Sequence, residues 1–199
     1  MELSPLAREK LAKIGDLTRE EKEKLRNSEQ LTPLLADYFT GKIRPEDLWQ
    51  ELKKQKDAGK EPMVKEAQAR LIDAMSLSSA DADFARARSG ILALETIKES
   101  GNYTTLELRL NSLETLRQQY RQEREKTYNT LRASVERQVR QASQQLAAQA
   151  QRNGTAFDFQ GSIEATTKSS PEWRSFLTRH EENYLRKLRE QLAQLRSLL

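Results

Sequence analysis

The feature that most constrains this chain is its long central stretch without a helix breaker. Neither Gly nor Pro occurs between Gly101 and Gly154. Thr104-Thr-Leu-Glu107 at the start matches a capping box, in which a threonine hydroxyl and a glutamate side chain satisfy the first free N–H groups of a helix. The stretch therefore predicts one helix of about 48 residues, which at 1.5 Å per residue is about 72 Å long.

Apolar residues recur along this stretch at steps of three and four, the spacing of one helix face. They are Leu106, Leu110, Leu113, Leu116, Tyr120, Tyr128, Leu131, Val135, Val139, Ala142, Leu146 and Ala150. The polar run 121–127 interrupts this stripe. Because a continuous apolar stripe is typical of a coiled-coil-like seam, we expect antiparallel neighbouring helices to pack on its two parts.

Two further segments can supply those neighbours. Residues 79–100 have apolar residues at roughly helical spacing, and residues 171–199 end in a repeat of leucines. The leucines are Leu185, Leu188, Leu192, Leu195 and Leu199. Together the two helices reach about 76 Å, close to the length of the long helix. We therefore expect the first to pack on its start and the second on its end, with the handover near 121–127.

Several short helices are expected before the long one. Helix starts are predicted at Ser4, Thr18, Asn27, Arg44, Pro62 and Ser79, and stops at Gly15, Gly41, Gly59 and Gly101. The whole pattern predicts an all-α protein. Residues 1–103 form a small helical domain, and residues 104–199 form a long helical arm, or coiled-coil hairpin, with a Gly/Ser/Thr-rich connector at 153–170.

Composition narrows the classes of protein that fit. Charged residues make up 32% and apolar residues 36%, which suits thin helical assemblies better than a thick core. The absence of cysteine excludes disulfides, thiolate-bound zinc and thiol catalysis. Because no segment resembles a signal peptide or a membrane span, we expect a cytoplasmic protein without a membrane partner.

No pattern in the sequence predicts an enzyme, a cofactor or a metal site. His180 is the only histidine, and we interpret it as an ordinary helix residue near the seam. Asp81 and Asp83 fall in the predicted first turn of a helix, where the helix dipole favours acidic residues without any metal. Neither a glycine-rich dinucleotide motif nor a Walker motif occurs.

The long helix offers one candidate nucleic-acid-binding face. Four arginines project within about 80° of one another at 100° per residue. They are Arg117, Arg121, Arg124 and Arg132. Arginine rows beside aromatic rings bind phosphates and stack on bases. Glutamates four residues away favour the alternative of a solvated face with ion pairs within the helix.

A second candidate surface is aromatic. Phe157 and Phe159 in the connector can lie near Trp173 at the start of the last helix. Such a cluster either packs internally or binds a partner. We expect Trp173 and Trp49 to act mainly as packing residues.

These observations favour a non-catalytic helical interaction protein, meaning a scaffold, adaptor or chaperone-like factor that presents a long arm to a protein partner. Homo-oligomerisation is a second expectation, because two flanking helices need not cover the whole apolar stripe. The alternative is a factor that binds a phosphate backbone through the arginine face.

Overall fold

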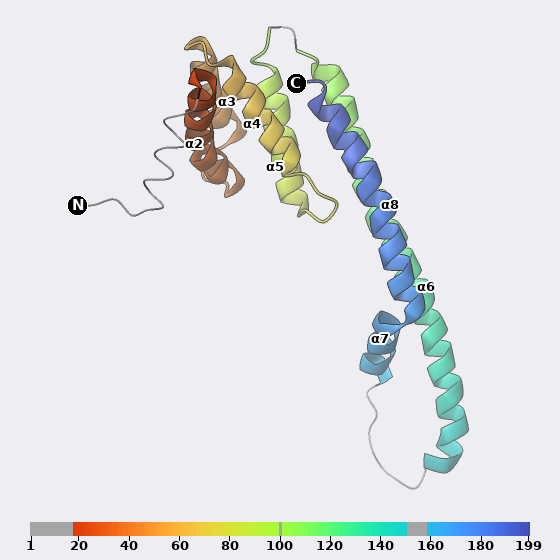
Figure 1. Cartoon of the computed structure of the whole chain (residues 1–199). Coiled ribbons are helices and arrows are strands. Elements are labelled where there is room, and N and C mark those ends of the chain that lie inside the picture. Colours follow the sequence, from red (N-terminus) through yellow and green to blue (C-terminus); the bar gives the residue numbers. More distant parts are fainter. Residues whose placement is uncertain (1–17, 100, 151–158) are drawn as a thin grey trace, which may run out of the picture. The chain divides into compact units, whose positions relative to one another are not determined.

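The structure, a computed structural model, describes residues 18–99, 101–150 and 159–199, without the side chains of 19, 20, 143–150 and 159. These ranges form seven α-helices and no strand, which confirms the all-α prediction (Figure 1). The chain divides into two compact units. Unit 1 comprises Met1–Glu107 with Leu195–Leu199, and unit 2 comprises Leu108–Gln194. The helix predicted from Ser4 lies outside the described residues.

Helix α2 (Arg19–Phe39) is one continuous helix where the sequence predicted two. The predicted capping box at Thr18 is confirmed: its hydroxyl accepts from Glu21 N at 3.2 Å, and the Glu21 carboxylate accepts from Thr18 N at 2.8 Å. The predicted new start near Asn27 is wrong. Pro33 removes only one backbone hydrogen bond, and burial of Leu31 and Tyr38 on the same helix offsets that loss.

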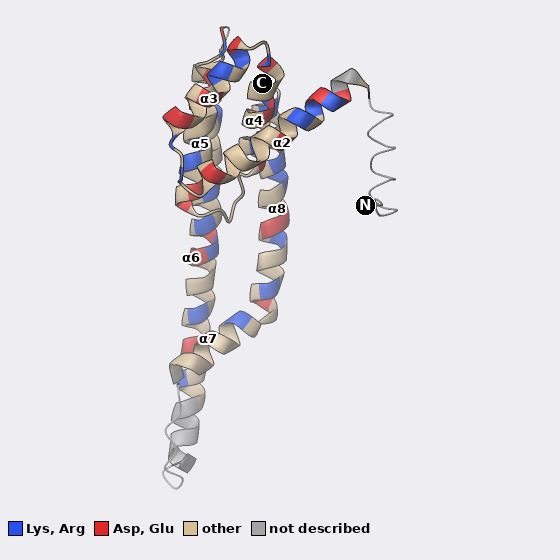
Figure 2. Cartoon of the chain, turned by 90° about the vertical axis from the view of Figure 1, so that its left-hand side faces the viewer, with Lys and Arg blue, Asp and Glu red and all other residues tan. Residues whose placement is uncertain are grey.

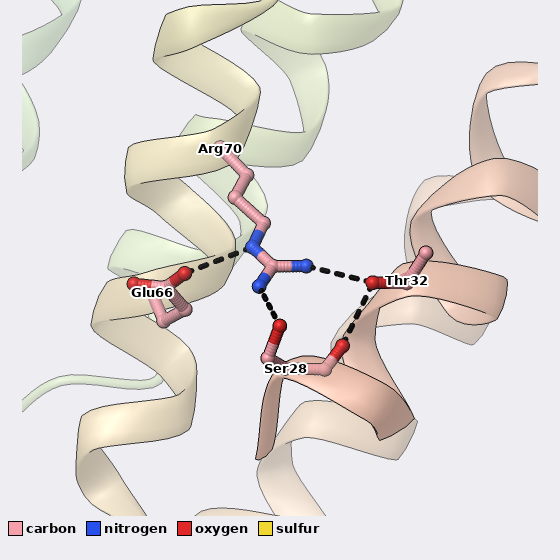
Figure 3. Close-up of polar contacts among 4 residues, drawn as sticks. All are labelled: Ser28, Thr32, Glu66 and Arg70. Atoms are coloured by element: carbon pink, nitrogen blue, oxygen red, sulfur yellow. Dashed lines mark hydrogen bonds and ion pairs between the residues drawn. The ribbon is translucent and has the colours of Figure 1, made fainter. Parts of the chain in front are cut away.

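Arg70 of α4 (Glu61–Asp73) ties α2 to its neighbour just before the proline (Figure 3). Its guanidinium donates to the hydroxyls of Ser28 at 2.7 Å and Thr32 at 3.1 Å. It also pairs with Glu66 at 2.9 Å. The Thr32 hydroxyl donates in turn to the Ser28 carbonyl at 2.8 Å. Side-chain hydrogen bonds therefore hold the turn of α2 that precedes Pro33.

The core of unit 1 lies among α3 (Pro45–Asp57), α4 and α5 (Asp81–Glu95), which pack on one another, while α2 contacts all three. The residues that fill it are apolar and almost completely buried. They include Leu31, Tyr38, Leu48, Leu52, Val64, Leu71, Ile72, Phe84, Ile91 and Leu94. Their three- and four-residue spacing on each helix explains why these segments form amphipathic helices.

Gly90 allows α5 to approach its neighbours closely. A Cβ atom on Gly90 would lie 3.0 Å from Leu71 Cδ1 and 3.1 Å from the Tyr38 hydroxyl. That hydroxyl donates to the Arg86 carbonyl at 2.6 Å. Burial raises the pKa of Tyr38 to about 12, so the hydroxyl keeps the proton that this hydrogen bond needs.

The remaining helices are α6 (Tyr103–Ala150), α7 (Phe159–Ser169) and α8 (Pro171–Arg196). Helix α6 has 48 residues, which confirms the predicted length. Helix α5 ends at Glu95, five residues before the predicted end. Helix α7 occupies most of the segment 153–170, so the second half of the predicted connector is helical.

Candidate functional site: the α6–α8 hairpin

Helix α8 runs antiparallel to α6 within unit 2. The Trp173 ring lies 5.3 Å from that of Tyr128, and the His180 ring lies 4.9 Å from that of Tyr120. Near the other end, the Arg109 guanidinium donates to the Gln194 side chain at 2.8 Å. As α8 residue numbers rise, their α6 partners fall. The two helices therefore form a hairpin, the antiparallel coiled-coil-like packing that the sequence predicted.

The predicted position of α8 along α6 is wrong. We expected the last helix to cover the end of α6 and to stop near 121–127, whereas its contacts extend from Tyr128 down to Arg109. The short helix α7 takes the place beyond it. Gln160, near the start of α7, accepts from Arg132 at 3.4 Å, and Ile163 and Thr167 are buried. The length comparison failed because it counted no helix between α6 and α8.

Opposite the exposed polar run 121–127 of α6, α8 carries aromatic side chains that contact Tyr120 and Tyr128 on either side of it. Six rings, which we call the aromatic ladder, form consecutive contacts at centroid distances between 4.6 and 5.5 Å. They are Tyr120, Tyr128, Trp173, Phe176, His180 and Tyr184. Large rings can bridge a stretch of the partner helix that lacks apolar side chains. The apolar stripe is interrupted there, but the contact between the helices is not.

The leucine repeat of α8 is only partly buried. Leu188 and Leu195 are 6% and 0% exposed, whereas Leu185 is 39% exposed. Tyr184 and His180 occupy the buried positions one and two turns before Leu188, respectively. The buried face therefore runs through His180, Tyr184, Leu188 and Leu195, and the regular leucine spacing did not identify it.

His180 has defined partners on α6. Its Nε2 lies 3.0 Å from the carbonyl oxygen of Tyr120, and its Nδ1 lies 3.5 Å from a carboxylate oxygen of Glu123. Glu123 also accepts a hydrogen bond from the Tyr184 hydroxyl. Burial, together with the neighbouring carboxylate, raises the pKa of Tyr184 to about 12, so its hydroxyl stays a donor. We interpreted His180 as lying near the seam; it lies inside it.

Only one residue of the predicted aromatic partner surface has a described side chain. Trp173 is 6% exposed and packs between Tyr128 and Phe176, so its ring contributes to the hairpin interior. Phe157 lies outside the described residues, and Phe159 begins α7 without a described side chain. The proposed grouping of the three rings therefore stays a prediction.

The four arginines of the predicted nucleic-acid face have different environments. Arg117 is only 4% exposed. Arg121, Arg124 and Arg132 are exposed, and Arg132 donates to Gln160 of α7. Figure 2 shows basic and acidic residues interleaved along both helices of the hairpin. At most three of the four arginines are thus available to a ligand.

Helix α6 continues beyond the start of α7 (Figure 1). Leu131, Val135 and Val139 are all half-buried, in contrast to the fully buried Leu110 and Leu113. We call these three residues the outer stripe. Their side chains remain partly open to solvent in the described part of the molecule.

Unit 1 contains a polar hollow of about 320 Å³ beside the end of α5. Glu95, only 2% exposed, lines it and accepts from Gln68 Nε2 at 2.9 Å and from Asn102 N at 2.7 Å. Lys98 Nζ lies 2.9 Å from the same carboxylate. Burial acts to raise the pKa of Glu95, but the hydrogen bonds from Lys98, Gln68 and Asn102 outweigh it and hold the pKa below its ordinary value.

This arrangement has a structural explanation. The Glu95 carboxylate joins α4 to the residue before α6, and its charge is matched by Lys98. Lys56, also at the hollow, donates to the Ile97 carbonyl at 2.8 Å. Sequence reasoning missed this cluster, because Glu95 and Gln68 belong to different helices and no local motif joins them.

No group of three or more potential metal ligands occurs among the described side chains. None of the described helices combines the length and apolar character needed to span a bilayer.

The chain matches the profile of a known protein family. The profile of the family described as "Family of unknown function (DUF6657)" matches residues 49–197. The matched segment begins within α3, ends just past α8, and leaves α2 outside. No curated protein and no solved structure matches the chain.

Proposed function

The chain belongs to the DUF6657 family, and we propose that it is a non-catalytic helical interaction protein that binds a helix of a protein partner along the outer stripe of α6. The supporting observation is the half-buried state of Leu131, Val135 and Val139, which lie at and beyond the point where α7 begins. An apolar face on a helix recognises an amphipathic partner helix through residues at three- and four-residue spacing.

The charges of unit 2 indicate what kind of helix fits. Residues 108–194 contain fifteen basic and ten acidic residues, a net charge of +5, whereas the rest of the chain carries a net charge of −1. Arg132 and Arg140 are exposed next to residues of the outer stripe, whereas Arg137 projects to the opposite side of α6. An amphipathic helix with acidic flanks therefore complements this part of α6 better than a basic one.

The absence of cysteine makes this proposal directly testable. A photo-crosslinker attached to Val139→Cys reports on the outer stripe, and Arg137→Cys is the matched control, because residues two apart project to opposite sides of a helix. We expect a crosslinked partner at position 139 that is absent at 137. The purified partner should bind the wild-type protein, and Val135→Glu with Val139→Glu should abolish binding.

Equal crosslinking at both positions, or purified-partner binding that survives the double substitution, would contradict the proposal. Crosslinking at 139 to a second copy of the chain would identify self-association through the same stripe. Light scattering distinguishes that case, because the mass of the protein would then exceed 23.0 kDa and return to it in the double variant.

A second candidate, binding to a nucleic-acid backbone, is favoured by the exposure of Arg121, Arg124 and Arg132 on the positively charged hairpin. It predicts salt-sensitive binding that is lost when Arg121 and Arg124 are both changed to Glu. The same double substitution leaves the outer stripe intact, so the two functions are separable. Lack of binding to RNA and DNA at low salt would eliminate this candidate.

A further inference from the structure

The hairpin contains one side chain that ordinarily changes charge near neutral pH. His180 is the only histidine, and the chain has no cysteine. Its ring is 7% exposed and lies at the contact between α6 and α8. Any pH dependence of hairpin stability between about pH 5.5 and pH 8 therefore points to this ring and, outside the hairpin, to the terminal amino group.

The backbone of α6 fixes where the ring holds its first proton. The Tyr120 carbonyl only accepts, so the nitrogen 3.0 Å from it, Nε2, must be the donor. In the neutral ring, Nδ1 then carries a lone pair. That lone pair faces the Glu123 carboxylate at 3.5 Å, an unfavourable contact between two acceptors.

A second proton reverses the sign of that contact. It can bind only at Nδ1, where it turns the contact with Glu123 into a charge-assisted hydrogen bond. The ring also lies parallel to those of Tyr120, at 4.9 Å, and Phe176, at 4.8 Å. Aromatic faces attract a cation between them. The Tyr184 hydroxyl, bonded to the same carboxylate, helps to keep it in place.

Other charged groups nearby set the size of the effect. Arg117, buried one turn before Tyr120 on α6, opposes a second positive charge in this part of the seam. Burial of the ring also opposes it. On α8, Arg179 and Glu181 flank His180 but are exposed. Because the Glu123 side chain is 59% exposed, solvent screens its attraction, and a modest effect is expected.

We propose that His180 and Glu123 form a proton-dependent latch between α8 and α6, which is engaged when the imidazole is protonated and released when it is neutral. The latch is a property of the hairpin itself. It goes beyond the proposed function and does not rest on it, because it needs no partner.

The test measures hairpin unfolding by urea in a Trp49→Phe background, in which Trp173 of the aromatic ladder is the only tryptophan. The unfolding equilibrium constant should be about threefold smaller at pH 5.5 than at pH 8, the size expected of a partly exposed ion pair. Glu123→Gln keeps an acceptor for Tyr184 but removes the charge, and should abolish this ratio. Glu125→Gln, an exposed change two residues further on, should leave it unchanged.

Two results would overturn the latch. One is a hairpin that is equally stable or less stable at pH 5.5; the other is a pH dependence that Glu123→Gln leaves intact. Nitrogen NMR of the single histidine gives a second measurement that does not depend on unfolding. At pH 8 the neutral ring should carry its proton on Nε2, and a proton on Nδ1 would contradict the geometry from which the proposal starts.

Discussion

Glu95 places a carboxylate inside unit 1, and its replacement by Gln tests whether that charge organises the end of α5. The side chain is 1% exposed, and its two oxygens accept from three groups. Oε1 accepts from Asn102 N, and Oε2 accepts from Gln68 and pairs with Lys98. A carboxylate suits this site because all its partners are donors.

The amide of Gln cannot satisfy the same partners. If its oxygen takes the Oε2 position, its NH₂ group faces the Asn102 N–H. If the oxygen takes the Oε1 position, the NH₂ group faces both Gln68 and Lys98. At best one donor is left unpaired in a buried site, and Lys98 loses its counter-charge. We expect Glu95→Gln to lower the free energy of unfolding by about 3 kcal/mol.

The assay uses Trp49 as a local reporter. Its indole N–H donates to the Thr96 hydroxyl at 2.9 Å, next to Glu95 in the chain, and Trp173→Phe removes the other tryptophan. Glu99→Gln is the matched control, because the Glu99 side chain is 95% exposed and lies 3.7 Å from Lys56. That control should leave the unfolding midpoint unchanged.

The pH dependence gives a second check on Glu95. Because the folded state holds the pKa of this carboxyl below its ordinary value, its charge stabilises the fold above the unfolded pKa. The stability is lost as pH falls through the lower, folded pKa. The difference between wild type and Glu95→Gln should therefore stay constant from pH 8 to pH 5 and shrink below about pH 4. The reasoning would be refuted if Glu95→Gln lowered the free energy of unfolding no more than Glu99→Gln does. It would also be refuted if the difference in unfolding free energy between wild type and Glu95→Gln stayed constant down to pH 3.

Two more substitutions test the packing of each unit. Gly90→Ala should destabilise the protein by about 1–3 kcal/mol in thermal unfolding, because the added methyl group would lie 3.0 Å from Leu71 and 3.1 Å from Tyr38. A stabilised variant would contradict this and show that the higher helix propensity of alanine outweighs the crowding. Leu188→Ala should cost about 2–4 kcal/mol, because this leucine is buried in the hairpin. Leu185→Ala, the matched change three residues earlier, should change circular-dichroism melting little, and equal losses would contradict the described register.

The long helix could be predicted because its determinants are local. Absence of Gly and Pro allows α6 to continue, and no tertiary contact is needed to see this. The capping box at Thr18 is equally local and formed as expected. Helix α7 could not be predicted in the same way, because Gly161 and the four threonines and serines of α7 resemble a loop. Burial of Ile163 and Thr167 overrides that local preference.

The aromatic ladder and the Glu95 cluster depend on contacts distant in sequence. Tyr120 and Tyr128 belong to the apolar stripe of α6, but His180 and Tyr184 lie outside the leucine repeat of α8. Reasoning from periodicity therefore favoured Leu185, which is exposed, over His180, which is buried. Likewise, Glu95 meets Gln68 only after α4 and α5 have packed.

The position of α8 connects these differences to the proposed function. If α8 had covered the end of α6, as the length comparison predicted, Val135 and Val139 would have been buried in the hairpin. The contacts of the aromatic ladder instead continue past the polar run 121–127. The twenty-six residues of α8 therefore pair with the first half of α6. Helix α7 has eleven residues, and its second residue, Gln160, already lies at Arg132. Because the aromatic ladder holds α8 against the first half of α6, α8 does not cover the outer stripe, which stays half-buried. We therefore propose that the partner helix binds there.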